Sequence, residues 1–267
     1  CHTCSRRFKT SARPVADPLR EAIVMSLETC IGAERNVFEE TPEHARRIIL
    51  ASPVLSPSKF NTIIGLSENT GEYKAIADNF KVSILDLNFD PTQQSLQQAI
   101  ASLCDKAEQA VIDGSAILVL DDSKLQQGQL PIHALMGTGA VHHRLVDSGL
   151  RCDANLIVKT GTARDPHHMA CLLGFGATAI YPYLAYQVLD DLLVTGELLG
   201  DPKVAYVNFR RGINKGLLKI LSKMGISTVA SYRGAQLFEA VGVANEVITL
   251  CFKGCLLYTS PSPRDGT

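Results

Sequence analysis

The 267-residue chain has no excess of charge of either sign and no long apolar run. Its 26 basic and 27 acidic side chains give a formal net charge of −1, so no overall field attracts a nucleic acid or an anionic membrane surface. No stretch approaches the roughly 18 consecutive apolar residues that a membrane-spanning helix requires. The first residues, CHTCSRRFKTSARP, lack the apolar centre of a secretory signal. We therefore expect a soluble chain with no nucleic-acid partner and no membrane partner.

A disulfide framework is not expected either. Eight cysteines are scattered along a chain in which 46% of residues are hydrophobic, and this apolar content is enough to bury a sizeable core without cross-links. A reducing compartment fits this cysteine usage best. The first four residues, CHTC, have the spacing of half a zinc site, but no second pair follows at finger spacing. We expect free thiols there.

Motifs of hydrolases and metalloproteases are also missing. The chain has no GxSxG nucleophile elbow and no HExxH pair. Five of its seven histidines lie between residues 133 and 168, and four of them form the adjacent pairs His142-His143 and His167-His168. Adjacent side chains on a helix point about 100 degrees apart, so neither pair easily presents both imidazoles to one metal ion. We expect one member of each pair to be hydrogen-bonded beneath the sheet and the other to be solvated.

Two glycine pairs resemble the start of a dinucleotide-binding loop but depart from it. GTG at residues 137–139 has His142 in place of the third glycine, and GFG at residues 174–176 follows a helix instead of a strand. We expect close helix packing at the first pair and a helix end at the second. The basic residues between 203 and 223 are interpreted as a solvated helix face and not as a phosphate site.

From residue 82 onward the sequence predicts alternating strands and helices, which is typical of an α/β fold with a mostly parallel sheet covered by helices. We favour an incomplete (β/α) barrel-like arrangement over an open sheet. An N-terminal helical arm precedes it, with helices at residues 17–32 and from about residues 43 and 58. Strands are predicted at residues 82–87, 116–120, 154–160, 177–180, 204–207, 226–231 and 246–250, and helices at residues 91–112, 132–148, 165–173, 184–194, 211–224 and 235–241.

The stretch from residue 154 to residue 182 is interpreted as one strand, loop, helix and strand. Asp165 caps its helix and Pro166 opens the first turn, because Asp accepts orphan backbone N–H groups and Pro has no N–H to satisfy. Such a tight crossover brings polar residues to the carboxyl ends of strands, where α/β folds hold their ligands. Asp121-Asp122, at the end of the preceding strand, either binds a cation or caps the loop. The polar residues of the crossover are Lys159, Thr160, Arg164, Asp165 and Tyr181.

The end of the chain differs in character from the rest. After Phe252 all periodicity is lost, and CLLYTSPSPRDGT resembles a translated cloning adapter more than a protein segment. We expect a domain over residues 8–252 and a non-native tail over residues 253–267, in which Gly254 can still be native. The assignment of residues 1–7 stays open.

Four long runs carry a family resemblance. They are DPLREAIVMSLETCIGAERNVFEE at residues 17–40, SPVLS at 52–56, GTGAVHHRLVDSGLRCDANLIVKTGTARDPHHMACLLGFGATAIYPYLA at 137–185 and NKGLLKILSKMGISTVASYRGAQLFEAVGV at 214–243. Together, and in this order, they resemble the central domain of glutamate synthase, of the large-subunit or the ferredoxin-dependent type. The resemblance covers the chain from about Phe8 to Phe252.

This resemblance implies a role inside a larger enzyme, an oxidoreductase acting on CH–NH2 donors. Glutamate synthase releases ammonia from glutamine in an N-terminal amidotransferase domain. The ammonia passes through a tunnel to a domain that carries FMN and a 3Fe–4S cluster, where it aminates 2-oxoglutarate, so that two glutamates form. The central domain joins the two and is credited with no reaction of its own.

The resemblance also implies what this chain lacks and which partners it has. It contains no close triplet of cysteines for the cluster, so we expect no cofactor and no metal in it, and no catalytic residue. The expected partners are the amidotransferase and FMN-binding domains of the same polypeptide, with a small reductase subunit or ferredoxin as electron donor. The expected compartment is the cytoplasm or a plastid, and the fragment alone is expected to be inactive.

An ammonia tunnel must exclude bulk water, and its wall needs small residues and backbone carbonyls more than charges. We therefore expect a tunnel wall or a domain interface at the strand end and at the following helix end. A free-standing α/β enzyme or nucleotide-binding protein that uses the strand ends near Thr160 and Asp121 is the alternative, and a pure interaction module is a third hypothesis. The residues expected at the tunnel or interface are Gly161, Thr162, Ala163, Arg164, Asp165, His168, Gly174 and Gly176.

Overall fold

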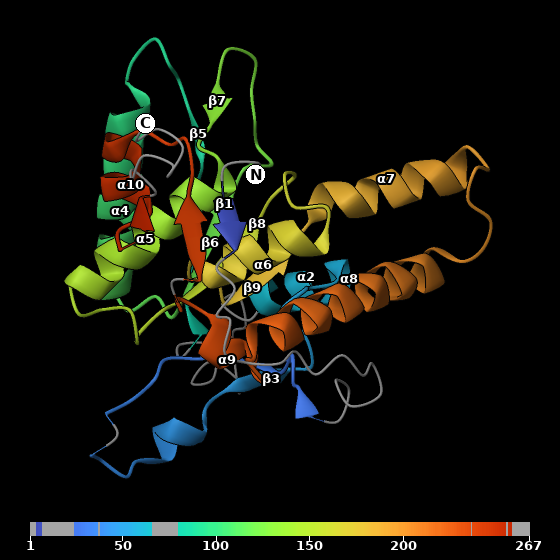
Figure 1. Cartoon of the computed structure of the whole chain (residues 1–267), viewed down its shortest axis with the longest axis horizontal. Helices are drawn as coiled ribbons and strands as arrows, with labels where there is room; N and C mark the ends of the chain where they lie inside the picture. Colours follow the sequence, from blue (N-terminus) through green and yellow to red (C-terminus); the bar gives the residue numbers. More distant parts are fainter. Residues whose placement is uncertain are drawn as a thin grey trace, which may run out of the picture.

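A four-stranded parallel sheet lies at the centre of the structure, a computed structural model (Figure 1). It describes residues 24–36, 38–65, 80–235 and 237–254, and residues 4–6 and 256–257 by their backbone alone. The strands are β4 (Val82–Asp86), β6 (Ile117–Asp121), β8 (Asn155–Lys159) and β9 (Ala179–Tyr181), in the order β4-β6-β8-β9. Every residue of β6 is buried, because this strand is covered on both faces, and its sequence ILVLD is accordingly a continuous apolar run with one carboxylate at its end.

A helix comes after each of the first three strands of this sheet, α4 (Leu96–Ile112) after β4, α5 (Ala134–Asp147) after β6 and α6 (Pro166–Gly174) after β8. The predicted cap of α6 is confirmed, since Asp165 accepts a hydrogen bond from the backbone N–H of His168 and Pro166 opens the helix. Helix α4 begins later than predicted, because Ser95 forms a capping box with Gln98. A short antiparallel pair, β5 (Asn88–Phe89) and β7 (Leu130–Pro131), lies beside this unit.

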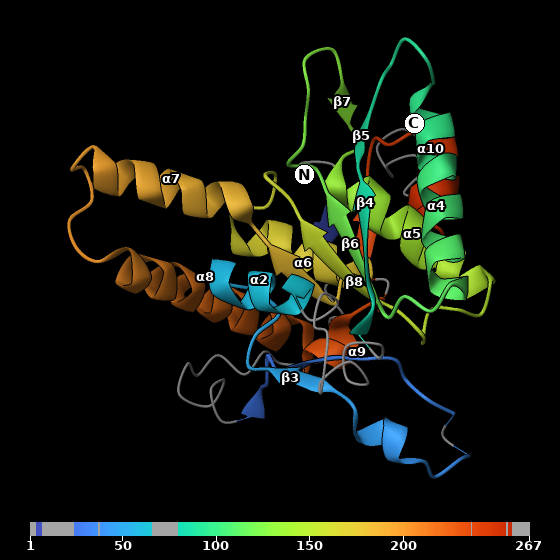
Figure 2. The same cartoon turned by 180° about the vertical axis from the view of Figure 1, so that it is seen from behind.

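The two faces of the sheet bury two separate clusters of apolar side chains. Leu118 and Leu120 of β6 belong to the larger core, which includes α4, α5, α6 and the C-terminal helices. Ile117 and Val119 point to the other face, as alternate strand residues must. There they meet helix α2 (Pro57–Gly65) and the antiparallel pair β2 (Thr29–Ile31) and β3 (Ile48–Leu50). The sheet is therefore a middle layer, with helices on one face and the N-terminal segment on the other (Figure 2).

The N-terminal arm differs in part from the prediction. The short helices near residues 43 and 58 are present as η1 (Pro42–Ala45), which is a 3-10 helix, and α2. The helix predicted to reach Gly32 is wrong at its end, where residues 29–31 form a strand, and its first part to residue 23 lies outside the described residues. Residues 29–31 form a strand because they pair with β3. The chain then passes close to Arg46 at Gly32, where φ is +147° and a Cβ would lie 2.9 Å from the backbone oxygen of Arg46.

Two antiparallel helices, α7 (Tyr183–Val194) and α8 (Pro202–Met224), form an arm that projects from the body (Figures 1 and 2). The strand predicted at residues 204–207 is wrong, because these residues lie in the first turns of α8. Asp201 accepts a hydrogen bond from the backbone N–H of Lys203, and Pro202 takes the first helical position. This start has the same chemistry as the Asp165-Pro166 start of α6, and it overrides the short apolar run that follows.

Three further short elements are wrong in type. A strand was predicted at residues 226–231 and helix α9 (Val229–Tyr232) is found; a helix was predicted at residues 235–241 and strand β10 (Phe238–Ala240) is found. The last predicted strand, at residues 246–250, is helix α10 (Asn245–Cys251). Contacts with elements distant in sequence determine whether these segments form strands or helices. Strand β10 pairs with β1 (Cys4–Arg6) and β11 (Leu256–Leu257). Helix α10 packs on α5, where a Cβ at Gly139 would lie 2.1 Å from the backbone oxygen of Cys251.

The predicted fold class is confirmed as α/β with a mostly parallel sheet and covering helices. Within the described part of the chain the sheet has four parallel strands and does not close into a barrel. The close helix packing expected at residues 137–139 is confirmed at Gly139, and the helix end expected at residues 174–176 is confirmed by the cap at Phe175 and by the φ of +110° at Gly176. In the segments described, no helix is both long and apolar enough to cross a bilayer.

Candidate functional site

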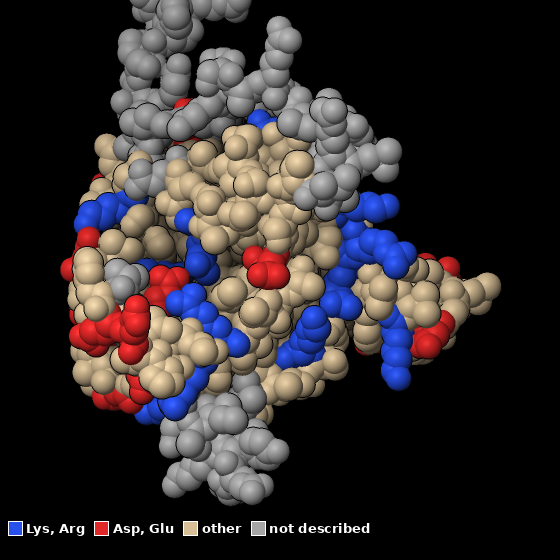
Figure 3. Space-filling view, turned by 90° about the horizontal axis from the view of Figure 1, so that it is seen from below, with Lys and Arg blue, Asp and Glu red and all other residues tan. Residues whose placement is uncertain are grey.

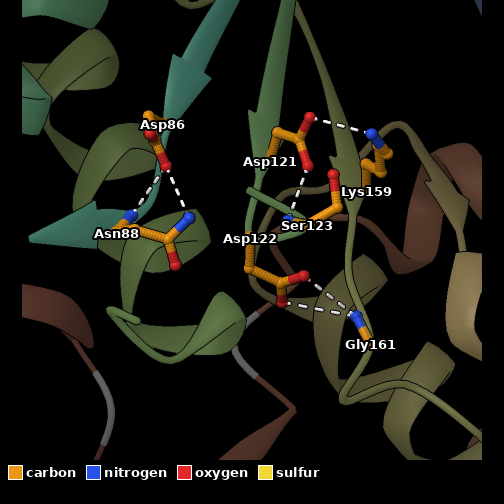
Figure 4. A network of polar contacts seen from close by, with 7 residues as sticks. All are labelled: Asp86, Asn88, Asp121, Asp122, Ser123, Lys159 and Gly161. Carbon is orange, nitrogen blue, oxygen red and sulfur yellow. Dashed lines mark hydrogen bonds and ion pairs between the residues drawn. The ribbon is translucent and has the colours of Figure 1, made fainter. Parts of the chain in front are cut away.

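Polar side chains meet at the carboxyl ends of β4, β6 and β8 (Figure 4). The Lys159 ammonium lies 2.9 Å from a carboxylate oxygen of Asp121, and the other oxygen of that carboxylate accepts a hydrogen bond from the backbone N–H of Ser123. Only 4% of the Asp121 side chain and 20% of the Lys159 side chain are exposed, so this ion pair is largely shielded from water. The charges of Asp121 and Lys159 therefore neutralise each other within the structure.

Asp122 closes the loop that follows β8. Its carboxylate accepts hydrogen bonds from the backbone N–H of Gly161 at 3.0 Å and from the hydroxyls of Thr160 and Tyr183. Burial raises the pKa of the Asp122 carboxyl, and these hydrogen bonds act against that rise. Of the two roles open for Asp121-Asp122, the structure has Asp122 capping the loop. Among the described residues no three His, Cys, Asp or Glu side chains gather in a way that could hold a metal ion.

Aromatic rings enclose the ammonium group of Lys159. The group lies 5.9 Å from the ring centre of Phe60 in α2 and 5.8 Å from that of Tyr183 at the start of α7. Phe60 stacks on Tyr181, with ring centres 4.3 Å apart, so three elements distant in sequence fix this corner of the sheet. Lys159 is thus held by a carboxylate and two rings, and the strand-end residues form a rigid cluster.

A cavity of about 40 Å³ lies beside this cluster, between the loop after β8 and the helices α5 and α6. A water molecule needs only about 10–15 Å³ of such space, so the cavity has room for one or a few very small molecules. Ala163 is 2% exposed and buried in its wall, whereas Thr162 and His133 are exposed at its rim. The lining residues are His133, Leu135, Thr162, Ala163, His168, Cys171 and Leu172.

Three of the eight residues expected at a tunnel or interface line this cavity: Thr162, Ala163 and His168. Asp165 stands behind them, because its carboxylate caps α6 and lies 3.5 Å from Nδ1 of His168. Gly161 passes close to Tyr183, whose hydroxyl would lie 3.1 Å from a Cβ there.

The remaining three expected residues lie apart from the cavity. Arg164 is exposed. Gly174 and Gly176 are close-packing positions, since an added Cβ would lie 2.2 Å from the Phe238 ring at the first and 2.3 Å from His142 at the second.

Four lining residues were not expected from the sequence. Cys171 and Leu172 lie three and four residues after His168, so the helical spacing of the predicted helix could have indicated them. His133 and Leu135 come from the start of α5, where the imidazole of His133 accepts a hydrogen bond from the backbone N–H of Leu135. No local signal links the start of α5 to the loop after β8.

The histidine pairs differ from the expectation that one member of each is solvated. All four imidazoles are half-buried. His142 accepts a hydrogen bond from the Arg151 guanidinium at 3.0 Å, and burial, with the nearby Arg151 charge, lowers the pKa of His142 to about 3. Burial also lowers the pKa of His143. The His142-His143 pair therefore serves packing, since neutral imidazoles are easier to bury than charged ones.

A larger cavity of about 390 Å³ opens at the amino end of β8. Its wall includes Glu28, Glu34, Arg47 and Arg233, so cationic and anionic groups are balanced there. The guanidinium of Arg233 donates a hydrogen bond to the Thr178 hydroxyl at 3.3 Å. This cavity lies at the amino ends of the strands, whereas α/β folds hold their ligands at the carboxyl ends.

Two solved structures share a distant likeness with this chain. A mandelate oxidase variant with benzaldehyde aligns with 91% of this chain and 88% of its own at 10% identity and a TM-score of 0.46. The flavin-binding domain of baker's yeast flavocytochrome b2 aligns with 60% of this chain and 38% of its own, at 16% identity and a TM-score of 0.40.

Sequence relatives are much more similar. The ferredoxin-dependent glutamate synthase of Pyropia yezoensis is 39% identical over 265 residues, and the NADH glutamate synthase of Schizosaccharomyces pombe is 39% identical over 251 residues. The large chain of the NADPH glutamate synthase of Bacillus subtilis is 36% identical over 247 residues. The alignments cover 93%, 92% and 92% of this chain but only 16%, 12% and 16% of those proteins, so the chain spans less than a fifth of the length of these relatives. A family description, the glutamate synthase central domain, matches residues 5–244, and the chain belongs to this family.

Proposed function

We propose that residues 8–252 are the central domain of a longer glutamate synthase, which converts glutamine and 2-oxoglutarate to two glutamates. The family match over residues 5–244 and the small share of each relative that the chain covers support this proposal. In that enzyme the domain links an amidotransferase domain to an FMN-binding domain of the same polypeptide. We assign residues 253–267 to a non-native tail; of these, only residues 253, 254, 256 and 257 lie within the described part of the chain.

The cofactors of such an enzyme, FMN and a 3Fe–4S cluster, do not fit the site at the carboxyl ends of the strands, where α/β folds hold their ligands. The cavity at the carboxyl ends of the strands measures about 40 Å³, whereas sites for ligands of drug or cofactor size usually take roughly 300–1,000 Å³. The cluster needs three neighbouring thiolates, and among the described residues no three cysteine side chains gather in this way. Both cofactors are therefore assigned to the rest of the polypeptide, and no reaction step is assigned to this chain.

The small cavity is the observation that supports an ammonia path through this domain. Ammonia is about the size of a water molecule, and the cavity holds little else. Its inner wall includes the apolar side chains of Leu135, Ala163 and Leu172, which carry no charge that would retain an ammonium ion. Thr162 and the two histidines supply polar atoms at the rim, so that a small polar molecule can exchange one hydrogen bond for another. Gly161 and Asp165 position this loop, and Arg164 faces outward toward a neighbouring domain.

The test replaces Ala163 by Leu in the intact polypeptide, with Ala101→Leu on the exposed face of α4 as the matched control. The isobutyl group of the first variant fills the cavity. We expect this variant to hydrolyse glutamine but to release the ammonia, so that the glutamate formed per glutamine hydrolysed falls, while the control keeps the wild-type ratio. An unchanged ratio in the Ala163→Leu variant would refute the ammonia path.

The isolated 267-residue chain is proposed to be inactive and free of cofactor. Purified chain should neither hydrolyse glutamine nor aminate 2-oxoglutarate, and it should not turn yellow on incubation with FMN. Stoichiometric FMN binding would contradict the assignment of the flavin to another domain.

The electron donor of the intact enzyme is a small reductase subunit or ferredoxin, and its compartment is the cytoplasm or a plastid. Relatives named as ferredoxin-dependent and chloroplastic, and relatives named for NADH and NADPH, support both alternatives. Assays of the intact polypeptide with reduced ferredoxin, NADH and NADPH distinguish the donors.

A further inference from the structure

Helix α8 has an unusual charge composition for a chain that is nearly neutral. Its 23 residues, PKVAYVNFRRGINKGLLKILSKM, include six lysines and arginines and no aspartate or glutamate. The whole chain carries a formal charge of −1. The positive charge is therefore concentrated on one element, which forms half of the projecting arm (Figure 1).

Five of these cations follow one i, i+4 row along the helix surface. They lie at intervals of four or eight residues, which places them on a single ridge, because residues four apart are neighbours on a helix surface. All five are exposed. In Figure 3, which views the molecule from below, lysine and arginine side chains form a band where the arm joins the body. The cationic ridge consists of Lys203, Arg211, Lys215, Lys219 and Lys223.

The ridge has no acidic partner among the residues that the structure describes. The ion pairs found there join other groups: Arg144, for example, contacts both Asp105 and Glu108 between α4 and α5. On α8, like charges follow one another at i, i+4 spacing from Arg211 to Lys223, which opposes helix formation. Charges of alternating sign stabilise a helix face that contacts only water. An unbroken row of cations is therefore explained better by contact with an anionic surface outside the described residues.

The arm also exposes apolar side chains beside the ridge. Val194 and Leu199, at its tip, are 87% and 88% exposed, and Val207 occupies the one position of the ridge's four-residue series that is not cationic. Apolar groups in an interface are typical of permanent association, whereas transient electrostatic encounters use polar surfaces. A permanent neighbour is available, because the relatives are more than five times longer than the part that this chain covers.

We propose that the cationic ridge is the docking surface for an acidic face carried by another part of the same longer polypeptide. The proposal rests on the proposed function only in requiring that polypeptide to exist. A nucleic acid fits less well, since the sequence pI is about 6.7 and aliphatic residues accompany the cations where base stacking would need aromatic ones.

Carbodiimide cross-linking of the intact polypeptide, followed by peptide mapping, tests this inference. The reagent joins lysine amines directly to carboxylates. We expect Lys215, Lys219 and Lys223 to be joined to carboxylates outside the 267 residues and within the same copy. The variant Lys215→Gln/Lys219→Gln/Lys223→Gln removes the amines, so a second variant, Lys203→Glu/Arg211→Glu, is used to measure docking while those amines remain.

In the second variant the yield of the cross-links should fall by roughly tenfold, the loss expected for a few surface charge pairs. The same cross-links should weaken in high salt, because a Debye length of about 3 Å at 1 M screens such pairs. The matched control, Lys106→Glu/Lys124→Glu, changes two exposed lysines outside α8 and should leave the yield unchanged.

Three results would overturn the proposal: no cross-link from the ridge, cross-links only between two copies, or a yield that the Lys203→Glu/Arg211→Glu variant does not lower. The assay also separates this inference from the proposed function. A polypeptide that forms glutamate but shows no ridge cross-link refutes the docking surface alone, and one that shows the cross-links without forming glutamate refutes the proposed function alone.

Discussion

Helix α8 contains two glycines, Gly212 and Gly216, one turn apart, and they should respond in opposite ways to the same substitution. A Cβ at Gly212 would meet nothing within 4 Å, whereas a Cβ at Gly216 would lie 2.3 Å from Cγ and 2.6 Å from Cβ of Pro166. The Pro166 ring cannot move freely, because it opens α6 directly after the capping residue Asp165. The absence of a side chain at Gly216 therefore lets α8 pack against the start of α6.

The expected magnitudes follow from two opposing effects. Replacing Gly by Ala in a helix favours folding by roughly 0.5–1 kcal/mol, and this gain applies at both positions. Overpacking against a fixed neighbour costs about 1–3 kcal/mol and applies only at Gly216. Gly212→Ala should therefore be stabilising by roughly 0.5–1 kcal/mol, and Gly216→Ala should be less stable than Gly212→Ala by about 1–3 kcal/mol.

The measurements are urea unfolding and thermal unfolding of the 267-residue chain, both followed by far-UV circular dichroism, since the chain has no tryptophan to report fluorescence. For a domain of this size the two variants should differ in Tm by roughly 2–12 °C. Equal stabilisation by both substitutions would show that α8 does not contact Pro166 as described, and would remove the link between the arm and the loop that lines the small cavity.

Three more predictions concern other regions. His142 has a pKa of about 3 in the folded chain, so the unfolded chain binds this proton first and the free energy of unfolding falls as the pH drops below about 6.5. His142→Gln should reduce this loss by up to about 1.4 kcal/mol per pH unit, measured as the free energy of unfolding at pH 7 and pH 5. An unchanged pH dependence in this variant would contradict the low pKa of His142. Burial raises the pKa of the Cys104 thiol to about 11 and of the Cys251 thiol to about 12. A thiol reagent at neutral pH should therefore modify the exposed Cys30 and Cys152 in the native chain and leave Cys104 and Cys251 unmodified, which peptide mapping measures. Lys219→Glu replaces two repulsive i, i+4 pairs on α8 by attractive ones and should raise the stability of the isolated chain by about 1 kcal/mol at low salt, whereas Lys106→Glu on α4, which lies next to Asp105 and near Glu108, should give no gain.

The central part of the fold could be predicted because local signals and tertiary packing agree there. The buried runs of β6 and β8 are apolar on both faces, and the start of α6 is marked by Asp165 and Pro166. The same Asp-Pro signal begins α8, but the short apolar run at residues 204–207 that follows it predicts a strand.

The C-terminal elements could not be predicted for a physical reason. Segments of three to seven residues, such as β10 and α10, fit the period of a strand and of a helix equally well. Their type is decided by partners far away in sequence, namely β1 for β10 and the backbone at Gly139 for α10. No local pattern contains this information.

The candidate site likewise has residues that the sequence predicts and residues that only the folded chain brings together. Thr162, Ala163 and His168 were expected together because one loop and one helix carry them. His133, Phe60 and Tyr183 reach the same corner from other elements, through contacts that only the folded chain creates.

The pairing of β1 with β10 joins residues near the two ends of the chain, with Cys4 opposite Ala240. A ribosome that adds roughly 5–20 residues per second needs on the order of 10–50 s to proceed from one of these residues to the other. The four strands of the central sheet, all of which precede residue 182, are synthesised well within that interval. During translation the central sheet can therefore form before β1 pairs with β10, and this pairing requires that the chain has been made as far as Ala240.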